Sequence, residues 1–166
     1  MILGFGSYLK DYLEYHNISQ VEFSRMLDIT PKHLNEILNK NIDISNELMI
    51  AISLITDIDI SFIMKIENNK KMKQYLKEKF GDNLKQYLKR FHINELEKKN
   101  WVVFTHKEDD YQNAIDILKF LKVRNFDAMD NILDSIQYKK KDDSDNTKLL
   151  LWITKCNEIA DKQTIN

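Results

Sequence analysis

The sequence contains very few of the residues that build tight turns and covalent cross-links. Its 166 residues include only three glycines, one proline and one cysteine. Because strands are joined by turns that favour Gly and Pro, this scarcity predicts helices joined by short polar loops. A single cysteine, Cys156, also excludes a disulfide within the chain and a zinc site built from several cysteines.

The sequence also lacks a long apolar run and an excess of positive charge. No segment approaches the roughly 20 apolar residues that a membrane span requires, and no basic stretch precedes an apolar one near residue 1. We therefore expect a soluble, cytoplasmic protein with no membrane partner. Residues 1–72 hold 7 Lys and Arg against 10 Asp and Glu, a net charge of −3, whereas residues 73–166 hold 18 against 16. The acidic first part argues against strong non-specific phosphate binding.

Apolar residues recur at helical spacing through most of the chain, which predicts an all-α fold. Ser19 with Glu22 matches a capping box, and Thr30 precedes Pro31 at a first helical position. Residues 101–104 (WVVF) are apolar and β-branched, so either a strand or a buried loop is open there, and residues 139–146 are expected to form a solvated loop. Helices are predicted at 4–16, from Ser19, from Thr30, from Ser45, at 57–68 capped by Asp59 or Ser61, and at 109–122, 126–138 and 147–162. We expect one domain at 1–70 and another at 71–166, with a boundary that can lie inside a continuous helix.

Residues 19–41, SQVEFSRMLDITPKHLNEILNKN, have the register of a helix-turn-helix. In such a pair the second helix projects its first residues into the major groove of DNA. Lys32 can then donate to guanine and Glu36 can accept from cytosine, while Gln20 can contact a phosphate or a base edge and residues 39–41 can contact phosphates. The predicted DNA-binding residues are Gln20, Pro31, Lys32, His33, Glu36, Asn39, Lys40 and Asn41.

The same pattern also fits two helices that merely pack together. The charges of residues 19–41 sum to zero, because the segment holds three basic and three acidic residues: Arg25, Lys32 and Lys40, and Glu22, Asp28 and Glu36. Glu36 would repel phosphate, and His33 can be an ordinary exposed polar residue. From spacing alone, both the DNA-binding and the purely structural interpretations stay open.

The segment resembles the Cro/C1-type (XRE) helix-turn-helix and, within it, the HigA antitoxin branch. The resemblance includes the Ser-Gln start, the small residue Ser24, the LD-IT turn, and LNEILNKN running into IDISNELMIAISLITDIDISFIMKIEN. It implies a five-helix domain that binds operator DNA as a homodimer, and an antitoxin-like autorepressor with a toxin as a further partner. An acidic residue is common in that branch at the place of Glu36. The family usually has Gly where this chain has Asp28.

Residues 73–166 resemble the middle region of longer XRE proteins in which a zinc peptidase of the ImmA/IrrE kind follows. The matching landmarks are Trp101, Trp152, Glu158 and Ala160. We expect the peptidase to be absent from these residues, because no two of the four histidines have the i, i+4 spacing of its metal site. The resemblance implies a small helical domain for dimerisation or partner binding. The alternative function is therefore a protein-interaction module, either a toxin-neutralising antitoxin or a phage or mobile-element regulator, with weak or no DNA binding.

No other motif predicts an enzyme. The run Gly4-Phe5-Gly6 is too short for a phosphate-binding loop, and the pairs Asp109-Asp110 and Asp142-Asp143 have the polar surroundings of caps and loops. We expect no catalytic residue, cofactor or metal, and Cys156 as a small buried hydrophobe. The aromatic residues of the second half are expected to form a core: Phe80, Tyr87, Phe91, Trp101, Phe104, Phe120, Phe126 and Trp152.

Overall fold

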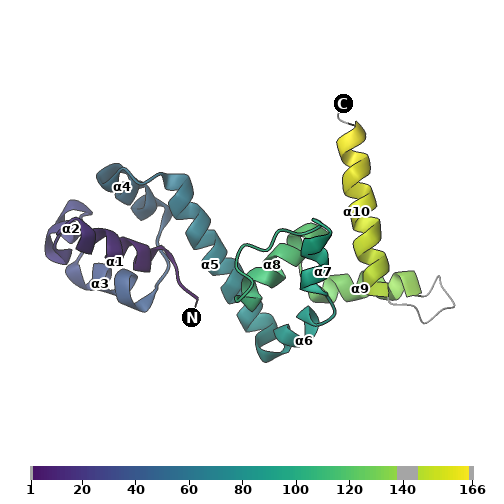
Figure 1. Cartoon of the computed structure of the whole chain (residues 1–166). Coiled ribbons are helices and arrows are strands. Elements are labelled where there is room, and N and C mark those ends of the chain that lie inside the picture. Colours follow the sequence, from purple (N-terminus) through teal and green to yellow (C-terminus); the bar gives the residue numbers. More distant parts are fainter. Residues whose placement is uncertain (1, 138–145, 165–166) are drawn as a thin grey trace. The chain divides into compact units, whose positions relative to one another are not determined.

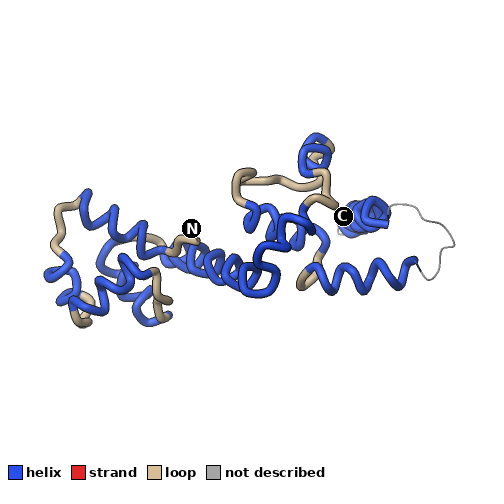
Figure 2. The backbone as a smooth tube through the Cα atoms, turned by 90° about the horizontal axis from the view of Figure 1, so that it is seen from below, coloured by secondary structure: helices blue, strands red, loops and turns tan. Residues whose placement is uncertain are grey.

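A computed structural model describes residues 2–137 and 146–164, and all regular secondary structure in those residues is helical (Figures 1 and 2). The all-α prediction is therefore confirmed. The chain divides into two compact units, Met1–Tyr75 and Leu76–Asn166. This division and the expected boundary after residue 70 both fall inside helix α5 (Ile60–Phe80). No helix in the described part of the chain is long and apolar enough to cross a membrane.

The first unit contains α1 (Phe5–Tyr15), α2 (Gln20–Met26), α3 (Pro31–Lys40), α4 (Asn46–Thr56) and the first turns of α5. These helices enclose one hydrophobic core, and α3 packs against both α1 and α2. The apolar side chains with no exposed surface in this core are Phe5, Leu9, Phe23, Leu34, Ile37, Ile52 and Ile63. Ile29, which follows the turn between α2 and α3, is partly exposed but packs against this core.

Side-chain caps fix where these helices begin. The hydroxyls of Ser19, Thr30 and Ser45 each accept a hydrogen bond from the backbone N–H three residues later, at 3.1–3.2 Å. Asp59 caps α5 by accepting from the Ser61 N–H at 2.7 Å. Each such cap satisfies a donor that the first helical turn leaves without a partner. The helix starts predicted at Ser19, Thr30 and Ser45 are confirmed.

Helix α5 extends well beyond the expected end near residue 68. Residues 69–80 contain no Gly or Pro, and most of them are Lys, Gln, Glu, Met or Leu, which have high helix propensity. The helix ends at the first glycine that follows, Gly81, whose φ is +47°. The expectation of a short fifth helix was wrong because nothing in this stretch interrupts the backbone hydrogen bonds.

The second unit begins with residues 76–80 of α5 and continues with a 3₁₀ turn, η1 (Gly81–Asn83), and α6 (Leu84–Leu88). The remaining helices are α7 (Ile93–Lys98), α8 (Asp110–Leu121), α9 (Phe126–Gln137) and α10 (Asn146–Thr164). The last three correspond to the helices predicted at 109–122, 126–138 and 147–162. Of the loop predicted at 139–146, only Asn146 lies within the described residues, and it begins α10.

An aromatic cluster forms the centre of this second core. The fully buried ring of Phe126 lies 5.1 Å from Tyr87, 5.5 Å from Phe80 and 6.0 Å from Phe91, between ring centroids. The prediction of an aromatic core is confirmed for Phe80, Phe91 and Phe126, and for Phe104, which is 6% exposed, while Tyr87 is half-buried and stacks on Phe126. It was wrong for Trp152, which is 58% exposed.

Other expectations for the second unit were met in part. Trp101, Phe120 and Cys156 are half-buried rather than buried. Residues 101–104 form neither helix nor strand, and Val102 and Phe104 point inward while Val103 is 78% exposed. The buried-loop interpretation of this run is the one that the structure supports.

Candidate nucleic-acid interface

Helices α2 and α3 form a bihelical unit joined by a tight turn. Asp28 lies in that turn with a φ of +53°, the left-handed region that favours glycine. The Ile29 N–H donates to the Ser24 carbonyl at 3.0 Å, which closes the turn, and the Ser24 side chain is completely buried. The position where the XRE family usually has glycine is thus one where the backbone requires a left-handed residue. Asp tolerates that conformation better than most residues do.

One face of α3 is buried and the opposite face is open to solvent. Leu34, Ile37 and Leu38 face the core. Among the predicted DNA-binding residues, the exposed ones are Pro31, Lys32, Asn39 and Lys40, and the partly exposed ones are Gln20, His33, Glu36 and Asn41. The structure therefore brings the α3 residues of this set together along the solvent-facing side of the helix.

The acidic and basic residues on this face partly neutralise each other. Lys40 Nζ lies 3.1 Å from Glu36 Oε1. The hydrogen bond and charge of Lys40 lower the pKa of Glu36, and the charges of Lys32 and His33 add to this effect. Glu36 is thus an ionised hydrogen-bond acceptor at neutral pH, suited to a cytosine amino group but not to a phosphate. Lys32 is the exposed cation at the start of the helix, where base edges are read.

Asn35 was missed by the sequence reasoning. It is exposed on α3 one turn after Lys32, and its amide can form the paired hydrogen bonds that recognise adenine. The i, i+3 spacing from Lys32 was the signal that could have identified it. Its neighbour Asn39 accepts a hydrogen bond from Lys10 Nζ at 3.1 Å, so α1 supplies a further cation close to the end of α3.

Asn41, one of the predicted phosphate contacts, has a role inside the domain. It ends α3 in the left-handed conformation, with a φ of +54°. Its side-chain amide donates to the Ile2 carbonyl and its amide oxygen accepts from the Gly4 N–H, both at 2.8 Å. The amide therefore joins the end of α3 to the start of the chain, and a contact to DNA by Asn41 stays a prediction.

A buried ion pair lies directly behind this junction. Glu67 Oε1 accepts from the Phe5 N–H at 2.7 Å and thereby caps α1. Lys70 Nζ lies 2.8 Å from Glu67 Oε2 and 2.9 Å from Asp43 Oδ1, and Lys70 and Glu67 are each 1% exposed. Burial acts to lower the pKa of Lys70, but hydrogen bonds to Glu67 and Asp43 outweigh it and raise the pKa above its ordinary value.

The glycines of the Gly4-Phe5-Gly6 run are required by close packing. A Cβ atom on Gly4 would lie 2.6 Å from Glu67 Oε1, and one on Gly6 would lie 2.1 Å from the Ile37 carbonyl oxygen. Gly4 thus makes room for the ion pair, and Gly6 allows α1 to pack directly on the backbone of α3. This gives the run a structural explanation and fixes the orientation of α3 relative to α1.

Comparison with known families agrees with this geometry. Residues 9–63, from within α1 to the start of α5, match a family model described as helix-turn-helix, which covers about a third of the chain. The match supports a DNA-binding regulator of the XRE type. Comparison with curated proteins and with solved structures gave no match. In the residues that the structure describes, no cluster of three or more His, Cys, Asp or Glu side chains could hold a metal ion.

Proposed function

We propose that this protein is a sequence-specific, DNA-binding transcriptional regulator that represses its own operon in the manner of an antitoxin. The observation that carries the proposal is the solvent-facing side of α3, where Lys32, Asn35 and Glu36 lie in the first two turns of the second helix of a helix-turn-helix. The proposal assigns the protein no catalytic step, cofactor or metal. Operator DNA is the partner that these side chains fit.

The neutral charge of the reading helices determines how such binding must work. Because Glu36 neutralises Lys40, few phosphate charges are compensated, and affinity must come from a few base contacts and from pairing two copies. We therefore propose a homodimer that reads two half-sites about one helical turn apart. Light scattering on the full chain, free and with operator DNA, measures this stoichiometry, and one chain per operator would contradict it.

The principal test is a fluorescence-anisotropy titration at low salt. The full chain is titrated into a labelled fragment of the promoter upstream of its own gene and into a fragment of the same composition in shuffled order. We expect the affinity for the promoter to be at least about a thousandfold higher, which is the lower end of the usual ratio of specific to non-specific affinity. Equal affinity for both fragments would contradict sequence-specific reading.

A substitution locates the reading face. We expect Lys32→Ala to weaken promoter binding by ~1–3 kcal/mol, because it removes a contact to a defined base. The matched control is Lys65→Ala, which removes an exposed lysine from α5, outside the helix-turn-helix pair. If both variants lose the same affinity, the effect is one of overall charge, and α3 does not read the bases.

A second function is favoured by the exposed apolar residues of α10. Trp152 is 58% and Ile159 47% exposed, and large apolar groups left open to solvent often mark a protein contact. A protein-interaction module, such as a toxin-neutralising antitoxin, would use this surface. Co-purification of the full chain with the product of the adjacent gene, and its loss in Trp152→Ala, would select this function, whereas the Lys32→Ala variant should retain the partner.

A further inference from the structure

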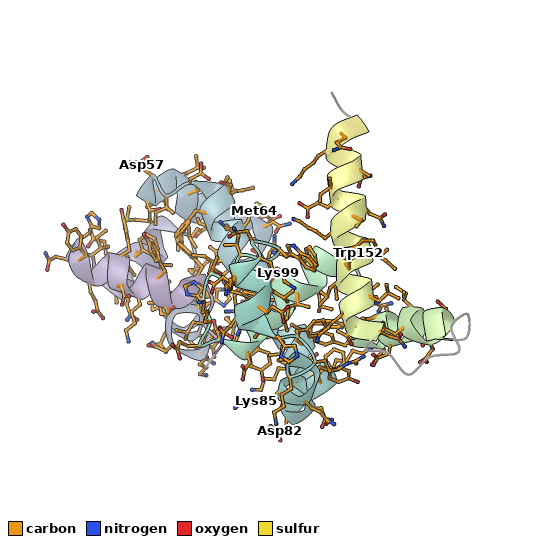
Figure 3. All side chains as sticks on the ribbon, turned by 45° about the vertical axis from the view of Figure 1, so that its right-hand side comes forward. Asp57, Met64, Asp82, Lys85, Lys99 and Trp152 are labelled. Carbon is orange, nitrogen blue, oxygen red and sulfur yellow. The ribbon has the colours of Figure 1, made fainter. Side chains whose placement is uncertain are left out.

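The second unit contains a pocket that the DNA-binding proposal does not use. It has a volume of about 320 Å³ and is lined by α7, the segment after it and the first turns of α10. Trp101 and Trp152 line it, and the buried Leu96 and Leu151 lie at its base. Figure 3 labels Trp152 on α10 together with Lys99, which follows α7. The volume of the pocket falls within the range of about 300–1,000 Å³ typical of small-molecule sites.

Cations are in excess around this pocket. Arg90, Lys99 and Lys148 line it together with a single carboxylate, that of Glu95. Lys99 Nζ lies 2.6 Å from Glu95 Oε1 and 5.1 Å from the centroid of the Trp101 ring. Arg90 also contacts Asp130 at 2.6 Å, and the hydrogen bond and charge of Lys99, together with the charge of Lys148, lower the pKa of the Glu95 carboxyl. Lining cations thus outnumber lining anions.

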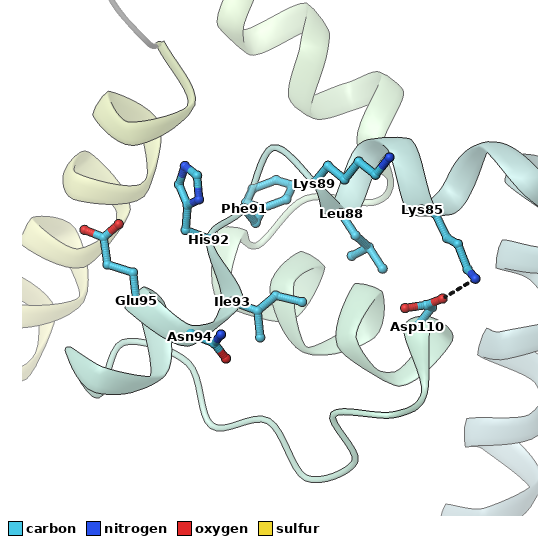
Figure 4. Close-up of a pocket in the computed structure, with 9 residues that line it drawn as sticks. All are labelled: Lys85, Leu88, Lys89, Phe91, His92, Ile93, Asn94, Glu95 and Asp110. Carbon is cyan, nitrogen blue, oxygen red and sulfur yellow. Dashed lines mark ion pairs between the residues drawn. The ribbon is translucent and has the colours of Figure 1, made fainter.

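A wider hollow beside α6 and α7 lacks this combination. It has a volume of about 680 Å³ (Figure 4). The phenyl ring that lines it, that of Phe91, is only 2% exposed, and its Lys85 lies 3.8 Å from Asp110. Two lysines and two carboxylates line this hollow, Lys85 and Lys89 with Glu95 and Asp110, so its charges balance, and it has no exposed indole or phenyl ring on which a flat ligand could pack. The smaller pocket provides both an excess of cations and an exposed indole ring.

We propose that the pocket lined by Trp101 and Trp152 binds a small anionic ligand with a flat aromatic body. The ring packs on the two indoles and on the aliphatic base, and the acidic group of the ligand faces Lys148 and Lys99. Aromatic side chains offer large, rigid contact surfaces, and charged hydrogen bonds fix the orientation of a ligand in an otherwise apolar site. The pocket is large enough for one fused ring system, which favours a small molecule over a helical segment of a protein.

The test uses three probes that share one indole ring and carry side chains of different charge: the anion indole acetate, the neutral alcohol tryptophol and the cation tryptamine. The full chain is labelled with ¹⁵N and titrated with each, and the indole N–H signals of tryptophan are followed by NMR. The chain has two tryptophans, and both line the pocket, so each of these signals reports on the site. We expect indole acetate to shift both signals saturably and tryptamine to bind about ten-fold more weakly, because it loses a charge-assisted contact.

Matched variants separate this pocket from general electrostatic attraction. Lys148→Met should weaken indole acetate about five-fold, whereas Lys162→Met, which removes an exposed lysine from the same helix outside the pocket, should leave the affinity unchanged. The free-state Trp101 signal in each variant shows whether the fold is intact. The proposal is overturned if indole acetate fails to shift the signals, if tryptamine binds as tightly, or if both variants lose affinity equally.

Discussion

Replacing Lys70 with methionine should destabilise the first unit more than any change on its surface. Methionine keeps the length and most of the apolar surface of the lysine side chain but removes the ammonium group. The Glu67 carboxylate, 1% exposed, would then keep only the hydrogen bond from the Phe5 N–H. Because α1 begins at that N–H, the loss reaches the contact between α1 and α3.

The magnitude follows from the environment of each partner. Removing one member of a buried ion pair costs about 3–5 kcal/mol, because the other charge is left uncompensated. The Asp43 side chain is 62% exposed, so its contact with Lys70 adds at most about 1 kcal/mol. We therefore expect a loss of about 4 kcal/mol from a domain stability of roughly 5–15 kcal/mol. Because the pKa of Lys70 is raised, its contribution is fully present below pH 10.5 and is lost as the pH rises through the higher folded-state pKa.

Urea unfolding of the full chain measures the effect by two signals. Circular dichroism reports the helices of both units, whereas tryptophan fluorescence reports only the second unit, because Trp101 and Trp152 both lie there. We expect Lys70→Met to lower the stability seen by circular dichroism and to leave the fluorescence transition in place. The control is Lys71→Met, an exposed neighbour that should change the stability by no more than about 0.5 kcal/mol.

A double substitution provides the refuting result. Glu67→Gln keeps a carbonyl oxygen for the Phe5 N–H but carries no charge, so combining it with Lys70→Met leaves no buried charge behind. We expect the double variant to be more stable than Lys70→Met alone by about 1–2 kcal/mol. If the two single losses simply add, or if Lys70→Met costs less than about 1 kcal/mol, then the ion pair does not hold this junction together.

Two further predictions use the same measurements or a titration. Gly6→Ala should cost about 3 kcal/mol in the circular-dichroism transition, because its Cβ would lie 2.1 Å from a backbone carbonyl of α3. Gly81→Ala meets open space and should cost only about 1 kcal/mol for its left-handed backbone, so equal losses would refute the packing explanation. The pKa of Glu158, lowered to about 2 by hydrogen bonds from Lys155 and Lys162, predicts that stability from this carboxylate is present above pH 4.5 and lost as the pH falls towards 2. A carboxyl NMR titration with a midpoint near 4.5 would contradict it.

Local signals in the sequence were sufficient to predict the helix-turn-helix. A cap depends on one hydroxyl and a backbone N–H three residues later, so Ser19 and Thr30 could be recognised without any tertiary information. Pro31 at the first helical position and the apolar spacing of α3 are equally local. The family resemblance added the expectation of glycine at Asp28, and the left-handed backbone found there explains that preference.

The remaining features depend on contacts between residues far apart in the sequence. Nothing near Lys70 predicts its burial. Glu67, three positions earlier, would fit an exposed ion pair equally well, its other partner Asp43 lies 27 positions earlier, and the surrounding lysines are typical of a solvated helix face. Asn41 was assigned to phosphate because its hydrogen bonds to Ile2 and Gly4 join residues 39 and 37 positions apart, which no local pattern in the sequence indicates. Trp152 was assigned to the core from residue type alone, which does not show that its face of α10 stays uncovered.

The ion pair between Glu36 and Lys40 bears on how a regulator is shared between its operator and the rest of a chromosome. Every genome offers on the order of a million or more competing sites, and most molecules of a strongly basic protein are bound to them. A helix-turn-helix whose charges cancel over residues 19–41 binds such sites weakly, so most copies stay free even when few molecules are made. Small changes in the number of copies per cell then change the fraction of operators that is occupied. Operator occupancy can therefore change as soon as a few molecules are made or degraded.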